Sequence, residues 1–154
     1  MKENTKLSEY YQIGKIISIL YRSGQSFFSH NIKDLDIGGG HMSLIFHLYK
    51  QDGASQEELA KALEVDKATV TRAIHKLEEQ GIVERRRDPV DQRINRIVLT
   101  ESGHSHQNEL KAITREWHET LLKDFTDEET ETLKYLLDKL MNNAVTYKNT
   151  LLKK

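Results

Sequence analysis

Only one proline occurs in the 154 residues of this chain, Pro89. Proline interrupts helices more strongly than any other residue, because its ring fixes φ and removes a backbone donor. A chain with so few interruptions is expected to be mainly helical. Apolar residues recur every three to four positions from Leu7 to Phe28, which predicts a long amphipathic helix. The run Gly38-Gly39-Gly40 ends this pattern and predicts a flexible connector.

The composition excludes several classes of protein. Charged residues make up 31% of the chain and hydrophobic residues 37%, and no apolar stretch approaches the roughly 18 residues that a membrane span needs. The absence of cysteine excludes disulfides, thiolate metal sites and iron–sulfur clusters. The first four residues are polar and do not begin a signal peptide. We therefore expect a cytoplasmic protein with no membrane partner.

Two short helices joined by a tight turn are predicted in the middle of the chain, after a helix over about residues 42–50. Residues 55–58 (Ser-Gln-Glu-Glu) have the form of a capping box, and Asp66 is a good N-cap for a helix from residue 67 to about 80. Gly81 supplies the C-terminal stop. This arrangement is a helix-turn-helix, whose second helix can enter the major groove of DNA.

The second helix has an exposed face suited to DNA. With Val70 at the centre of the buried face, a helical period places Ala68, Arg72 and His75 on the opposite side, flanked by Thr69 and Lys76. The fork of Arg72 fits guanine O6 and N7. The alternative is an ordinary solvated helix face, and this helix alone does not decide between the two.

An arginine-rich hairpin follows. Residues 82–87 and 94–99 are predicted strands, joined by the loop 88–93. Five arginines fall between positions 85 and 96, and residues 61–96 carry a net charge of +2 although the whole chain carries −1. A basic hairpin directly after a helix-turn-helix is typical of a winged helix, whose wing follows the DNA backbone or enters the minor groove. A charged, solvated edge hairpin is the alternative, and the combination with the preceding helices favours DNA binding.

Long helices are also predicted near the C-terminus. Thr100 or Ser102 would cap one through Leu110, Ile113, Trp117 and Leu121, and residues 126–129 form a second capping box before the last helix. Such helices need a partner for their apolar stripe, because helix propensity alone contributes little. The first and last helices could bury theirs on each other or on a second copy of the chain.

These motifs resemble the MarR family of winged-helix transcription regulators. The match runs through residues 55–60, 65–72, 77–83, 88–93 and 99–103. An Asp-x-Arg wing followed at a fixed distance by Leu-Thr-x-x-Gly is the most specific part of the match. Two positions depart from the pattern: Glu64 stands where many relatives have glycine, which puts the turn geometry in question, and His41 stands where many have glutamine.

The resemblance implies an obligate homodimer whose first and last two helices interlock, with two winged-helix lobes on a pseudo-palindrome. It implies recognition-helix contacts by Lys67, Ala68, Thr69, Thr71 and Arg72, with Arg93 as the wing arginine and Asp91 as the carboxylate that holds it. The full set of candidate DNA contacts also contains Ser55, Gln56, His75, Lys76, Arg86 and Arg96. A pocket for a phenolic or other aromatic or lipophilic effector is implied as well, and Tyr21, His41, His47 and Trp117 could line it.

Catalytic and metal sites are not indicated. His104 and His106 are two positions apart on a predicted helix, so their side chains diverge, and His41 and His47 are not aligned either. The glycine run lacks the spacing of a phosphate-binding loop, and no motif links a nucleophile to a base. We expect a non-enzyme with no cofactor and no metal.

The predicted fold class is mainly α: a winged helix-turn-helix with a small β-hairpin wing and long terminal dimerisation helices. The expected domains are residues 1–35, the N-terminal dimerisation helix; 36–100, the DNA-binding domain; and 101–154, the C-terminal dimerisation helices. The expected function is a sequence-specific, ligand-responsive transcriptional repressor that binds a pseudo-palindromic operator as a homodimer. The alternative is a winged helix that serves as a protein-interaction module without a specific DNA site.

Overall fold

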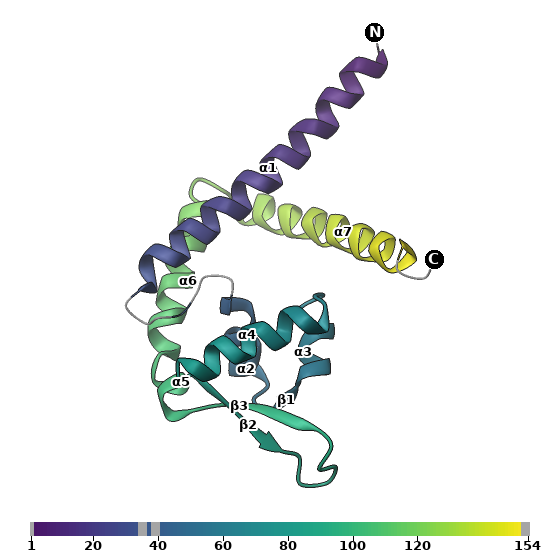
Figure 1. Cartoon of the computed structure of the whole chain (residues 1–154). Helices are drawn as coiled ribbons and strands as arrows, with labels where there is room; N and C mark the ends of the chain where they lie inside the picture. The colour runs from purple at the N-terminus through teal and green to yellow at the C-terminus, as the bar shows by residue number, and fades with distance from the viewer. Residues whose placement is uncertain (1, 34–36, 38–40, 152–154) are drawn as a thin grey trace. The chain divides into compact units, whose positions relative to one another are not determined.

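The computed structural model describes residues 2–33, 37 and 41–151, and the fold is mainly helical with one small antiparallel sheet (Figure 1). Two compact units can be distinguished, residues 1–114 and residues 115–154. In chain order the elements are α1 (Lys2–Asn31), α2 (Met42–Lys50), β1 (Ala54–Ser55), α3 (Gln56–Ala62), α4 (Lys67–Glu79), β2 (Val83–Arg87), β3 (Asn95–Leu99), α5 (Glu101–Ser105), α6 (Gln107–Leu121) and α7 (Asp127–Leu151). The connector predicted at Gly38-Gly39-Gly40 lies outside the described residues.

The helix-turn-helix consists of α3 and α4, and its predicted caps are confirmed. Ser55 Oγ accepts a hydrogen bond from the Glu58 N–H at 3.2 Å, and the Glu58 carboxylate accepts one from the Ser55 N–H at 2.7 Å. Asp66 caps α4 through the Thr69 N–H. In the turn between the helices Glu64 has φ +53°, which is the left-handed conformation that glycine adopts without strain. The turn is therefore formed with glutamate in a position that favours glycine.

The sheet has three strands in the order β1-β3-β2, all antiparallel. The predicted hairpin is confirmed: Val83 pairs with Leu99 and Arg86 with Arg96. The short strand β1 was not predicted, because two residues are too few to show an alternating pattern. It pairs Ser55 with Arg96, and so brings the start of α3 beside the wing.

The hydrophobic core of the first unit lies between the helix-turn-helix, α2 and the sheet. The buried face of α4 consists of Val70, which was predicted there, together with Ile74 and Leu77, and Ala73 is half-buried beside them. The other fully buried large side chains are Ile32, Leu44, Ile45, Leu48, Leu59, Ile97 and Leu110. Because Ile32 follows α1 and Leu110 belongs to α6, both long helices are anchored to this core at one end.

The long helix predicted after the wing is interrupted, which corrects the expectation of one continuous helix from Thr100 or Ser102. Thr100 caps the five-residue helix α5, whose Gly103 N–H donates to Thr100 Oγ1 at 3.0 Å. α5 ends at Ser105, with His106 as its C-cap, and α6 begins at Gln107. The position of Gly103 explains the short helix: it packs against the Ile82 backbone carbonyl, which holds α5 on the sheet.

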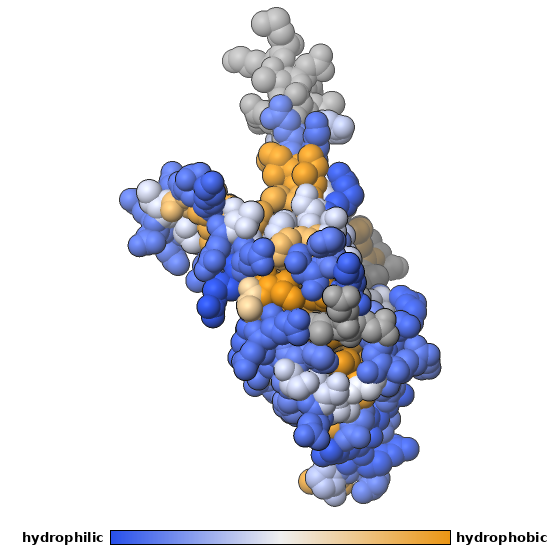
Figure 2. Space-filling view, turned by 90° about the vertical axis from the view of Figure 1, so that its left-hand side faces the viewer, coloured by the Kyte–Doolittle hydropathy of each residue, from blue (hydrophilic) through white to orange (hydrophobic). Residues whose placement is uncertain are grey.

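An exposed apolar stripe covers the described part of α1. Ile13, Ile16, Ile17 and Leu20 are 46–56% exposed, although aliphatic side chains of this size are usually buried. Figure 2 shows orange side chains gathered on this helix, below the grey residues at its N-terminal end. The amphipathic helix predicted from the sequence is therefore present, and the four apolar side chains named here are exposed. None of the helices in residues 2–33 and 41–151 is long and apolar enough to cross a membrane.

The second unit consists of the end of α6 and of α7. The capping box at Thr126 is confirmed: the Glu129 N–H donates to Thr126 Oγ1 at 3.2 Å, and the Thr126 N–H donates to Glu129 Oε2 at 2.9 Å. None of the residues described in α7 is buried. Leu136, Leu137 and Met141 are 49–54% exposed. The described part of α7 therefore also carries exposed apolar side chains.

Candidate nucleic-acid interface

The first turn of α4 is held rigidly by Asp66. Its Oδ1 accepts the Thr69 N–H at 2.8 Å, and its Oδ2 accepts the Thr69 hydroxyl at 2.7 Å. The hydrogen bonds from Thr69 lower the pKa of Asp66, so the carboxylate is ionised at neutral pH. A fixed first turn gives the side chains that follow a defined direction.

The face of α4 opposite its buried residues is exposed, as the sequence predicts. Lys67, Ala68, Arg72, His75 and Lys76 all lie on the surface. Arg72 Nη2 donates to Thr69 Oγ1 at 3.1 Å, which leans its guanidinium along the helix toward the first turn. His75 Nδ1 and Lys76 Nζ each lie 3.6 Å from a carboxylate oxygen of Glu79. This surface offers cationic donors on a rigid helix, which is what major-groove contacts require.

Gln56 and Thr71 connect the two helices of the motif. The Gln56 amide donates to Thr71 Oγ1 at 3.2 Å, and the Thr71 hydroxyl donates to Lys67 O at 2.8 Å. Both residues were predicted as DNA contacts, and the structure brings them together on the surface. The hydrogen bond between their side chains joins α3 to α4.

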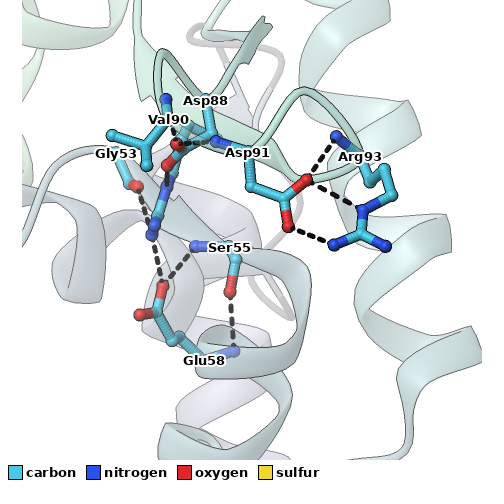
Figure 3. Close-up of polar contacts among 8 residues, drawn as sticks. Gly53, Ser55, Glu58, Asp88, Val90, Asp91 and Arg93 are labelled. Carbon is cyan, nitrogen blue, oxygen red and sulfur yellow. Dashed lines mark hydrogen bonds and ion pairs between the residues drawn. The ribbon is translucent and has the colours of Figure 1, made fainter.

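The wing loop carries the paired hydrogen bonds expected between Asp91 and Arg93. Arg93 Nε donates to Asp91 Oδ1 and Nη2 to Oδ2, each at 3.0 Å (Figure 3). The Arg93 side chain is 90% exposed. The hydrogen bonds from Arg93 lower the pKa of Asp91 and raise that of Arg93, so the pair stays ionised. The arginine is held in one orientation while it remains open to solvent.

The other predicted wing arginines differ in their surroundings. Arg86 pairs with Glu84 on its own strand, with Nε 2.8 Å from Glu84 Oε1. Arg96 lies on β3 and pairs with Asp88 and Glu58. Arg86 is 67% exposed and Arg96 is 31% exposed. The structure therefore places Arg86 on the outer surface and turns Arg96 toward protein carboxylates.

Two residues outside the predicted set shape this surface. Asp88 Oδ1 accepts the N–H groups of Val90 and Asp91 at 2.8 and 2.9 Å, which fixes the loop (Figure 3). Glu58 closes the capping box of α3 and also accepts a hydrogen bond from Arg96. An aspartate two residues before a loop N–H is a recognised turn former, and this signal could have identified Asp88. The sequence contains no signal for the contact between Glu58 and Arg96, which are 38 residues apart.

The four residues expected at an effector pocket are divided between the two units of the chain. Tyr21, His41 and His47 belong to the first unit, and Trp117 belongs to the second. Tyr21 is 67% exposed on α1. His41 is half-buried, and desolvation, with the charge of Lys76 as the smaller cause, lowers its pKa. Among residues 2–33, 37 and 41–151, no three His, Asp or Glu side chains gather closely enough to hold a metal ion.

The sequence of this chain is similar to those of known transcriptional regulators. The MarR family profile matches residues 40–94, which span the end of the N-terminal region, the helix-turn-helix and most of the wing. An uncharacterized HTH-type transcriptional regulator of Bacillus subtilis, YybA, is 33% identical over 127 residues, which cover 82% of this chain and 85% of that protein. The chain belongs to the MarR family. It is a winged-helix, DNA-binding transcriptional regulator and not an enzyme, as the sequence motifs predicted.

Solved structures of MarR proteins are similar to this chain over most of its length. A MarR transcriptional regulator from Methanosarcina mazei is 38% identical, with a TM-score of 0.80 over 89% of this chain and 99% of that one. A mutant MarR from E. coli, crystallised with operator DNA, is 27% identical, with a TM-score of 0.76 over 86% of this chain and 95% of that one. The likeness therefore extends beyond the winged helix to the flanking helices.

Proposed function

We propose that this MarR-family regulator is a repressor that binds a pseudo-palindromic operator as a homodimer. The observation that carries the proposal is the pairing of an exposed cationic face on α4 with an arginine held ready at the wing tip. Arg72 would contact base edges in the major groove, and Arg93 would contact phosphates or the minor groove. The E. coli MarR crystallised on operator DNA has the same fold, which supports this use of the surface.

The dimer is supported by the exposed apolar stripe of α1. A two-fold interface would bury the exposed apolar surface of Ile13, Ile16, Ile17 and Leu20 away from water. The exposed apolar residues of α7 would contribute in the same way. A two-fold dimer would place its half-sites about one helical turn apart, ~10 bp. Sedimentation of the intact chain at micromolar concentration should give a dimer, and removal of residues 125–154 should abolish both dimerisation and operator binding.

Selection of duplexes by the purified protein tests the proposed operator. Genomic fragments and random duplexes are mixed with the protein, and the bound sequences should converge on an inverted repeat. A titration at several salt concentrations separates this function from a winged helix that binds only proteins. Specific binding should persist at salt concentrations that release random duplexes, since the non-specific component is mainly electrostatic. Equal and weak binding of all duplexes would favour the protein-interaction module.

The ligand response is the second part of the proposal. A small phenolic or other aromatic or lipophilic effector would bind between the helices that form the dimer and the winged-helix lobe, with Tyr21, His41, His47 and Trp117 as candidate contacts. A panel of simple phenols is added to the preformed operator complex. Release of DNA at ligand concentrations that leave the protein folded would support the proposal, and an unchanged complex with every compound would count against it.

A further inference from the structure

Arg96 bridges two carboxylates that belong to different parts of the winged helix. Its Nε donates to Asp88 Oδ2 in the wing loop at 2.6 Å, and its Nη1 donates to Glu58 Oε2 on α3 at 2.9 Å. Nη1 also lies 3.5 Å from the Gly53 carbonyl oxygen. With 31% of its side chain exposed, against 90% for Arg93, Arg96 directs its donors at protein acceptors. The sequence groups the two arginines together, but the structure separates their environments.

The Asp88 end of this bridge fixes the wing tip. While Asp88 Oδ2 accepts from Arg96, Oδ1 accepts the backbone N–H groups of Val90 and Asp91 (Figure 3). These hydrogen bonds lower the pKa of Asp88 to about 2, so it is fully charged near neutral pH. Asp91 in turn holds Arg93. A continuous set of contacts therefore runs from Arg96 to the exposed arginine of the wing.

The Glu58 end connects the same arginine to the helix-turn-helix. Glu58 Oε2 accepts from the Ser55 N–H (Figure 3). The same oxygen accepts from Arg96, so it belongs to both the capping box and the bridge. Strand pairing strengthens the connection, because Ser55 lies opposite Arg96 in the register of β1 and β3. The start of α3 and the wing are thus joined by backbone and side-chain contacts at one point.

We propose that Arg96 is a positioning residue that holds the wing tip in register with α3 and so acts on DNA through Arg93. The planar fork of arginine is needed, because two donors on different sides of the guanidinium reach two carboxylates at once. A lysine would keep the charge but would lose this geometry. Nε and Nη1 already donate to protein acceptors, so contact of these two nitrogens with a phosphate would require Arg96 to leave Asp88 or Glu58. The effect of Arg96 on DNA binding can be measured only if the chain binds an operator, so this part of the inference rests on the proposed function.

Three substitutions separate positioning from direct contact. The probe is the tightest duplex that the wild-type protein selects from random sequences. We expect Arg96→Met and Arg96→Lys to weaken binding by similar factors, on the order of tenfold, within the range of coupling between contacting residues. We also expect Glu58→Gln to weaken binding although it removes a negative charge, because a neutral amide oxygen still fits the capping box but holds Arg96 less strongly than a carboxylate does. If Arg96→Lys binds like the wild type, or if Glu58→Gln binds more tightly, Arg96 contacts DNA directly and the proposal is overturned.

A double variant tests whether Arg96 acts through Arg93. Arg93→Met should weaken binding and reduce the salt dependence by about one ion in the wild-type background. In the Arg96→Met background both effects should shrink, because the wing is no longer in position. Loss of global stability would not produce this result in protein that remains folded. Full additivity of the two substitutions would overturn the proposal.

A measurement without DNA keeps the proposal separate from the proposed function. Amide hydrogen exchange at Val90 and Asp91 in the full chain should be faster in Arg96→Met than in the wild type, and that at Leu77 in α4 should be unchanged. If the wild type selects no duplex, the proposed operator binding is wrong, and the exchange rates still decide the role of Arg96. Unchanged exchange at Val90 and Asp91 would show that Arg96 does not hold the wing.

Discussion

The backbone carbonyl of Ile82 occupies the space in which a side chain at Gly103 would begin. A Cβ built on Gly103 would overlap this oxygen and would lie 3.1 Å from Leu99 Cδ2. The carbonyl is itself fixed, because it accepts the Thr100 N–H at 3.0 Å. On the other side, Tyr49 donates its hydroxyl to the Gly103 carbonyl at 2.7 Å. Glycine therefore permits α5 to lie against the sheet, which accounts for the glycine of the Leu-Thr-x-x-Gly motif.

Gly103→Ala should destabilise the winged helix. The added methyl group meets backbone that cannot move without breaking a hydrogen bond, and we expect a loss of about 1–3 kcal/mol in the free energy of unfolding. Urea denaturation measures this loss. Ser102→Ala, at an exposed position of the same helix, is the matched control and should change stability by no more than about 0.5 kcal/mol. Equal midpoints for the two variants would show that the close approach carries no cost.

Glu64 provides a test of strain in the turn between α3 and α4. A non-glycine residue in the left-handed region costs about 1–2 kcal/mol, and Glu64 lies there with φ +53°. Glu64→Gly should therefore be more stable than Glu64→Ala by about 1 kcal/mol. Both variants lose the glutamate side chain, so their difference isolates the backbone. Thermal unfolding of the two should show this order, and equal melting temperatures would argue against strain.

The sequence predicted the elements that depend on local signals. The caps at Ser55, Asp66 and Thr126 and the buried face of α4 each follow from residues within one or two turns of helix, and all are confirmed. The pair Asp91–Arg93 is equally local. Contacts between distant segments could not be predicted, since β1 and the bridge from Arg96 to Glu58 depend on how the chain folds back. Arg96 was grouped with exposed wing arginines for this reason.

The break between α5 and α6 is another long-range effect. The pattern from Thr100 to Leu121 suits one helix, but the contact of Gly103 with Ile82 holds the first turns against the sheet. The apolar stripe of α1, in contrast, follows from a local signal. Its apolar residues recur at helical spacing in the sequence, and the structure exposes Ile13, Ile16, Ile17 and Leu20.

Stability at low pH should depend on Asp88. Hydrogen bonds from the Asp91 N–H, the Arg96 side chain and the Val90 N–H lower its pKa from 3.8 to about 2. Because the folded state favours the charged form, the stabilisation is complete above pH 3.8 and is lost as the pH falls toward 2. Urea unfolding across this range should show a shallower pH dependence for Asp88→Asn than for the wild type. Parallel curves would mean that Asp88 does not contribute to acid unfolding.

Arg72 should make a base contact within the operator. It lies on the exposed face of α4, opposite Val70 and Ile74, and its fork matches a guanine edge. We expect Arg72→Ala to weaken operator binding by roughly 1–3 kcal/mol and to relax preference at one position in each half-site. Selection of random duplexes by wild type and variant measures both effects. An unchanged preference at every position would remove Arg72 from the base-reading set.

Asp91→Asn distinguishes simple charge from pre-organisation at the wing. Counting charges predicts tighter DNA binding, because the substitution removes one negative charge near phosphates. The geometry predicts the opposite, since Asp91 holds Arg93 by two hydrogen bonds of 3.0 Å before DNA arrives. Without them the exposed guanidinium would lose conformational freedom only on binding, which opposes association. We expect Asp91→Asn to bind more weakly than the wild type.

Arg93→Ala should weaken binding further, and the double variant should bind like Arg93→Ala alone, because Asp91 acts on DNA only through its arginine. Titrations of the selected duplex at several salt concentrations measure these losses. If Arg93 neutralises a phosphate, Arg93→Ala should reduce the salt dependence by about one ion. If it enters the minor groove, discrimination of A·T-rich flanks should fall instead. The control is Glu57→Gln, which removes an exposed negative charge from α3 and so gives the effect of charge alone on DNA binding. Tighter binding by both Asp91→Asn and Glu57→Gln would show that net charge governs the wing and that holding Arg93 in advance does not matter.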